Sequence, residues 1–118
     1  MAMKPRALFV IQSDPRSSHR PAEAIRAAAG IGAWQRVEVA VYLRGPALLL
    51  LSEDTDGLVD EDHLRQYLPV LQRGNFPVLA QANAPELAYL GRTPWRWEPL
   101  DEAQLAALAA ESACVLVF

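Results

Sequence analysis

The sequence predicts an α/β fold: a three-layer α/β/α sandwich around a mostly parallel sheet. Short apolar runs of strand length recur along the 118-residue chain, and helix-length segments lie between them. Strands that alternate with helices indicate β/α units with parallel pairing and right-handed crossovers. A chain of this length, 52% hydrophobic and 21% charged, is predicted to form one domain over residues 1–118 with a sizeable core.

The predicted strands are four apolar runs and one mixed segment. The apolar runs are residues 7–11 (ALFVI), 37–43 (VEVAVYL), 76–82 (FPVLAQA) and 114–118 (CVLVF). Near-continuous apolar content is typical of strands buried on both faces of a parallel sheet. A further short strand is expected at 95–98 (WRWE), where aromatic and charged residues alternate, nearer the sheet edge.

Two longer helices are predicted from capping and stop signals. Ser17 and Ser18 are expected to cap a helix that runs to about Gly30. Residues 60–74 have leucines at helical spacing and a final glycine, and Pro69 is expected to kink or split that helix.

Three shorter helices complete the alternation. Pro46 begins a leucine-rich segment that is predicted to be a short buried helix. Asn83 with Glu86, and Asp101 with Gln104, form capping-box patterns, in which a cap residue is followed three positions later by Glu or Gln. These patterns predict helix starts at both places.

Composition argues against several function classes. The formal net charge of −3 provides no basic field for nucleic acid. The N-terminal apolar run of five residues is too short for a signal peptide or a membrane span, so we expect a soluble, cytoplasmic protein. Cys114 is the only cysteine, and it has no thiol or histidine at ligand spacing, so neither a disulfide nor a metal site is predicted.

Ligands of open parallel sheets gather at the carboxyl ends of the strands, and the loops there carry the candidate binding residues. Helix N-termini and two arginines at this edge suit a small anion, and Arg16 and Arg44 are expected to converge on it. Asp14 is expected to orient an arginine or fix the turn. The alternative is that these residues only cap helices or are solvated. The candidate residues are Ser13, Asp14, Arg16, Ser17, Ser18, Arg44 and Asn83.

No catalytic residue and no cofactor is predicted. Ser18 and His19 are neighbours whose side chains diverge on a helix, and the chain lacks the GxSxG elbow of hydrolases. It also lacks a phosphate-binding glycine loop between strand and helix. A flavodoxin-like flavin or nucleotide carrier, with Trp95 or Trp97 covering the ring, is kept as an alternative.

Nearly the whole chain resembles the DsrE/DsrF/DsrH-like group, the sulfur-relay family that includes the TusBCD-type proteins. The likeness lies in the order of elements and in the segments AEAIRAAAGIGAWQRVEVAVYLRGPALLLLSE, GNFPVLAQANAPELAYLG and ACVLVF. The resemblance implies a five-stranded parallel sheet between helices and a homo-oligomer, commonly a trimer or hexamer. The segments WRWE and ALLLL are also expected to supply apolar interface surface.

One departure from the family bears on activity. Members that carry sulfur have a cysteine after the third strand, where a helix N-terminus favours the thiolate. In this chain Asn83 takes that place, and Cys114 is expected to be a buried structural residue of the last strand. We therefore expect a non-catalytic binding or accessory protein for a small anion or a protein partner. A sulfurtransferase that uses Cys114 is the alternative.

Overall fold

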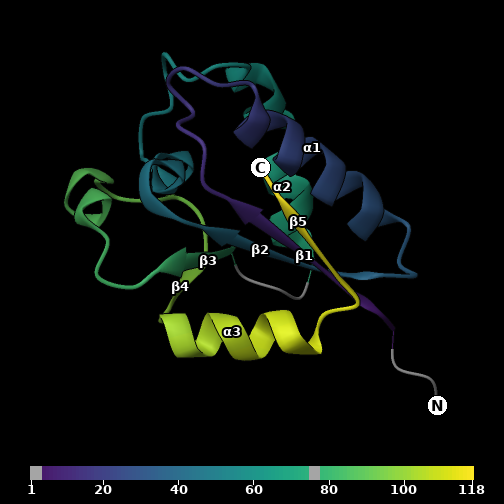
Figure 1. Ribbon diagram of the computed structural model, residues 1–118. Coiled ribbons are helices and arrows are strands. Elements are labelled where there is room, and N and C mark those ends of the chain that lie inside the picture. Colours follow the sequence, from purple (N-terminus) through teal and green to yellow (C-terminus); the bar gives the residue numbers. More distant parts are fainter. Residues whose placement is uncertain (1–3, 75–77) are drawn as a thin grey trace.

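Helices and strands alternate as predicted from the N-terminal strand to the last one (Figure 1). The computed structural model describes residues 4–74 and 78–118. The elements are β1 (Arg6–Ile11), α1 (Arg20–Ala33), β2 (Glu38–Leu43), the 3-10 helix η1 (Gly45–Leu51), α2 (Glu61–Arg73), β3 (Val78–Gln81), the 3-10 helix η2 (Pro85–Tyr89), β4 (Trp97–Leu100), α3 (Glu102–Glu111) and β5 (Cys114–Val117). The predicted strand at 76–82 begins two residues later, and residues 76 and 77 lie outside the described chain.

The five strands form one parallel sheet in the order β4-β3-β2-β1-β5. The chain moves outward from β1 to β4 and then returns to add β5 on the other side of β1. Because right-handed crossovers place their helices according to the direction of travel, this return puts α3 on the opposite face from α1 and α2. Figure 1 shows the resulting three layers, which confirm the predicted sandwich.

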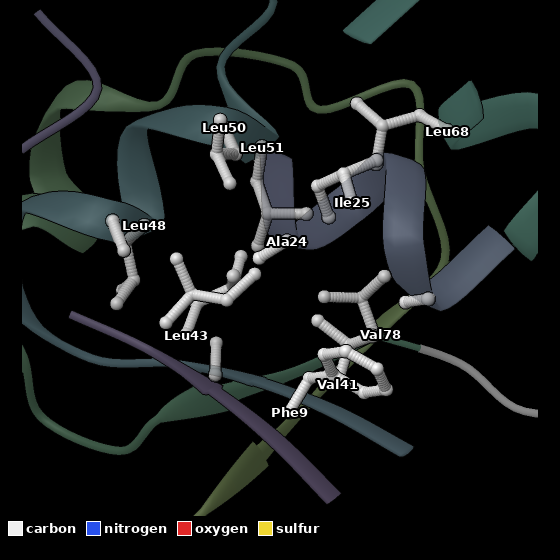
Figure 2. Close-up of a cluster of buried hydrophobic side chains, with 14 of the residues drawn as sticks. Phe9, Ala24, Ile25, Val41, Leu43, Leu48, Leu50, Leu51, Leu68 and Val78 are labelled. Carbon is white, nitrogen blue, oxygen red and sulfur yellow. The ribbon is translucent and has the colours of Figure 1, made fainter. Parts of the chain in front are cut away.

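The main core lies between the sheet and the layer of α1, α2 and η1 (Figure 2). Alternate residues of β1 and β2 face this side, because successive side chains of a strand point to opposite faces. The largest buried contributors are Phe9, Ile11, Ile25, Leu43, Leu48, Leu50, Leu51, Leu64 and Leu68. Three of the four leucines of η1 are therefore buried and the fourth, Leu49, is half-buried, so the expectation that ALLLL forms an exposed interface is wrong.

The opposite face carries a smaller core. Leu8, Val10, Ala40 and Tyr42 pack there against Leu105, which is the one buried side chain of α3. The capping box at Asp101 is confirmed, because its carboxylate accepts the N–H of Gln104 at 2.8 Å and the Gln104 side chain accepts the Asp101 N–H at 2.9 Å. A single ten-residue helix thus covers this face.

Two predicted helix caps are wrong, the first because of a local turn and the second because of a proline. The carbonyl of Asp14 accepts the N–H groups of Ser17 and Ser18, so these serines close a turn and α1 begins after His19. Asn83 is not the cap of η2. Ala84 is held in extended backbone before Pro85, as proline requires of its predecessor, and the 3-10 helix begins after it.

Pro69 does not divide the helix in which it lies. α2 continues through Pro69 as one element, and it ends at Gly74 as predicted. The short strand predicted at WRWE is present at the sheet edge as β4, shifted two residues along the chain. Trp95 and Trp97 are half-buried against the main core, so they contribute little exposed apolar surface.

The expectation of a buried Cys114 is wrong. β5 occupies the second sheet edge, next to β1, and all four of its residues are exposed. The apolar run 114–118 resembles the buried runs of β1 and β2 in composition, but an edge strand has a neighbour on one side only. Phe118, just after the strand, is the exception, because its ring stacks on Phe9 at a centroid distance of 5.9 Å.

Candidate functional site

The loop after β1 is built around the pair Asp14 and Arg16. The Asp14 carboxylate accepts the Arg16 backbone N–H at 2.9 Å, and its two oxygens accept Nε at 3.0 Å and a terminal guanidinium nitrogen at 2.9 Å. The guanidinium hydrogen bond, followed by the one from the backbone, holds the pKa of the Asp14 carboxyl below its usual value of 3.8. The expectation that Asp14 orients an arginine agrees with this geometry.

The remaining residues of this loop are engaged in the backbone framework. Ser13 donates its N–H to the carbonyl of Phe118 at 3.3 Å, which joins the loop to the end of β5. Ser18 Oγ accepts the N–H of Arg20 at 3.1 Å, and Ser17 is exposed. Asn83, after β3, is exposed in left-handed backbone with φ of 63°.

Arg44 follows β2 and points to the α3 side of the sheet. One terminal nitrogen of its guanidinium lies 3.0 Å from each carboxylate oxygen of Glu102, in the first turn of α3. The guanidinium carbon lies 5.7 Å from the centre of the Tyr42 ring, two residues earlier on the same face. Its backbone continues the ladder, since the Arg44 N–H donates to the carbonyl of Ile11 at 2.9 Å.

Two buried polar atoms at this place have no hydrogen-bond partner in the described part of the chain: Nε of Arg44 and the hydroxyl of Tyr42. The Tyr42 side chain has no exposed surface. Buried polar groups are nearly always satisfied in folded proteins, so both atoms are expected to have a partner, such as an ordered water, that the described residues do not supply. The Arg44 guanidinium therefore has one donor, its buried Nε, without a partner among the described residues.

Arg16 and Arg44 do not share a partner. Arg16 pairs with Asp14, and the nearby carboxylate of Glu86 in η2 also favours its charged form, whereas Arg44 pairs with Glu102 at the start of α3. Their convergence on one anion stays a prediction. Sequence reasoning missed Tyr42 and Glu102. Tyr42 could have been found from its two-residue spacing to Arg44, but Glu102 requires the crossover that brings α3 over β2.

Gly45 holds the other side of Arg44. It adopts left-handed backbone with φ of 56°, which a glycine tolerates without strain, and this turns the chain from β2 directly into η1. Its N–H donates to Oε1 of Gln81, at the end of β3, at 2.9 Å. The chain after β2 is thus joined to the end of β3.

A second side-chain pair joins the starts of two helices. Nδ1 of His19, before α1, lies 2.7 Å from a carboxylate oxygen of Asp60, before α2. Asp60 has left-handed backbone with φ of 56°. Among residues 4–74 and 78–118 no hydrogen bond joins a serine hydroxyl to His19, and the pair links the start of α1 to the start of α2.

A pocket of about 790 Å³ lies at the amino ends of the strands, where α1 and α2 end. It borders Gly74 and Val78 and therefore adjoins residues outside the described chain. The described ranges hold no group of three or more side chains suited to a metal ion. Nor does any helix in them combine the length and apolar character needed to cross a membrane.

Comparison with known proteins identifies the fold. No protein-family model matches the chain, and no curated protein matches it. Among solved structures, the crystal structure of the YchN protein from E. coli is similar, with a TM-score of 0.78, 19% sequence identity, and coverage of 98% of this chain and 100% of that chain. At this identity the likeness shows the fold, which is α/β of the flavodoxin-like, DsrE-like type.

Proposed function

We propose that this protein binds a small oxyanion at the carboxyl edge of its sheet through Arg44, as a non-catalytic binding or accessory protein related to the sulfur-relay proteins. The observation that carries the proposal is the unused Nε donor of Arg44. Packing over the Tyr42 ring restricts the orientation of the guanidinium. An oxyanion that accepts from Nε and a terminal nitrogen makes the two parallel hydrogen bonds that arginine forms best.

Glu102 competes with the anion for the same guanidinium. Its side chain is 72% exposed, so its ion pair with Arg44 is of the kind that contributes about 0–1 kcal/mol in water. A doubly charged oxyanion can therefore displace it, after which Glu102 is solvated. Because a carboxylate remains nearby, we expect weak binding that decreases as ionic strength rises.

The proposal of binding without catalysis follows from the residues at this edge. Asn83 stands where the resemblance places a sulfur-carrying cysteine, and an amide forms no persulfide. Cys114 is the first residue of β5, so it lies at the amino ends of the strands, whereas Arg44 follows the carboxyl end of β2. The fold shared with YchN supports the family relation.

Calorimetric titration of sulfate, phosphate and thiosulfate tests the proposal. We expect saturable binding to the wild-type protein and its loss in Arg44→Ala. Arg26→Ala is the matched control, because Arg26 is also an exposed arginine paired with a carboxylate, on α1. Arg16→Ala shows whether the loop after β1 contributes. Equal responses of the wild type and Arg44→Ala would reject the oxyanion site.

A second candidate function is persulfide carriage by Cys114, and it is favoured by the exposure of that thiol. Incubation with a persulfide donor followed by mass spectrometry distinguishes it. A mass gain of one sulfur atom that disappears in Cys114→Ser would support the carrier. On the oxyanion account alone, Cys114 reacts with alkylating reagents but gains no stable sulfur.

A further inference from the structure

β5 presents an unusual amount of apolar surface at an open sheet edge. Within the described part of the chain, five large hydrophobic side chains are exposed, and three of them are consecutive on this strand: Val115 (43%), Leu116 (38%) and Val117 (51%). An edge strand also leaves one row of backbone N–H and C=O groups without ladder partners. Both properties favour pairing with another strand.

The other edge of the same sheet provides a contrast. β4 carries Glu98 and Pro99, which pair in register with Leu79 and Ala80. Charged residues and proline on an edge strand are devices that prevent further pairing. β5 has neither. At its outer edge a guanidinium nitrogen of Arg20 lies 3.4 Å from the carbonyl of Val117.

The backbone alternation identifies which groups of β5 face outward. Phe118 donates its N–H to the carbonyl of Val10 at 2.8 Å and accepts the N–H of Gln12 at 2.8 Å, so its groups point to β1. Every second residue of a strand repeats this direction. Val115 and Val117 therefore direct their N–H and C=O groups away from the sheet, as the contact of Arg20 with the Val117 carbonyl also indicates.

We propose that β5 pairs with β5 of a second copy of this chain, antiparallel and about a two-fold axis at Leu116. In this register Val115 lies opposite Val117 of the partner subunit, and the two residues exchange both backbone hydrogen bonds. The symmetry repeats the exchange on the other side of Leu116. All the outward backbone groups of β5 are then satisfied at once, and the two five-stranded sheets become continuous.

The charges at the two ends of β5 favour a second copy in this orientation. Glu111, shortly before the strand, is exposed and lies 3.8 Å from the guanidinium of Arg6 in its own chain, and Arg20 lies beside the end of the strand. An antiparallel two-fold contact brings Arg20 toward Glu111 of the partner subunit, whereas a parallel contact would align like charges. The inference does not depend on the oxyanion site.

Disulfide trapping tests the register. In the Cys114→Ser background, Leu116→Cys places two thiols across the axis, where facing Cα atoms of a non-hydrogen-bonded pair lie about 4.5 Å apart, within disulfide range. Val117→Cys is the matched control, because its two copies are offset along the strands. We expect mild oxidation to produce a covalent dimer of Leu116→Cys, and to cross-link Val117→Cys about tenfold more slowly or not at all. Equal rates would overturn the register.

Sedimentation provides an independent measurement of the contact. The wild type should sediment as a dimer or a multiple of it in the micromolar range, and the double variant Val115→Lys with Val117→Lys should be monomeric. Both valines are exposed, so circular dichroism should show that the fold is kept. Tyr89→Lys, at an exposed site on η2, should leave the assembly unchanged. A monomeric wild type, or a double variant that assembles normally, would reject the proposal.

Discussion

Replacement of Tyr42 by phenylalanine should stabilise the ligand-free protein. The Tyr42 side chain is fully buried on β2, and its hydroxyl has no hydrogen-bond partner in the described ranges. A buried polar group without a partner destabilises the folded state by about 1–3 kcal/mol, and phenylalanine removes the hydroxyl while it keeps the ring that packs under Arg44. We therefore expect the free energy of unfolding to rise by about 1 kcal/mol, which corresponds to roughly 3–6 °C in Tm for a chain of this size.

The assay is urea and thermal unfolding followed by circular dichroism, in a chloride buffer free of oxyanions. Tyr89→Phe is the control, because the Tyr89 side chain is 76% exposed and its hydroxyl is hydrated, so its stability should stay within about 0.5 kcal/mol of the wild type. A loss of stability in Tyr42→Phe would refute the reasoning, since it would mean that the hydroxyl makes a favourable hydrogen bond in the folded protein.

Three further predictions concern α3 and the loop after β1. Leu105→Ala should lower the free energy of unfolding by about 2–3 kcal/mol in urea titrations, because Leu105 is the one buried side chain of α3. The Asp14 carboxyl should titrate below 3.8 in an NMR pH series and return toward that value in Arg16→Ala. Because its pKa is lowered by folding, its contribution to stability is present above about pH 4 and lost as the pH falls through the folded value, and Asp14→Asn should remove that part of the pH dependence. Glu102→Gln should tighten sulfate binding about two- to fivefold in calorimetry, because the competing carboxylate is gone.

The layers of the fold could be predicted from local patterns, but the burial of each strand could not. The segments of β1 and β5 are both short apolar runs, and they were expected to be equally buried. Their difference arises from the strand order, which places β1 inside the sheet and β5 at its edge. No local pattern in the sequence contains that information. The error over Cys114 has the same cause.

The sequence indicated where the candidate residues lie, but it did not indicate all of the residues that meet there. The rule that ligands gather at the carboxyl ends of parallel strands led to Arg44, and the short-range pair of Asp14 and Arg16 was accessible because only two residues separate them. Glu102 lies 58 residues from Arg44 in sequence. Glu102 reaches Arg44 because the chain turns back across the sheet after β4, which places α3 on the opposite face from α1 and α2.

The most direct test of the oxyanion site is the NMR signal of the Arg44 Nε–H group during a titration with sulfate. The account predicts a saturable shift of this signal, because the anion supplies the acceptor that Nε lacks, while the Nε–H signal of Arg26 stays in place. An Arg44 signal that does not move, or that moves linearly and together with that of Arg26, would contradict the account.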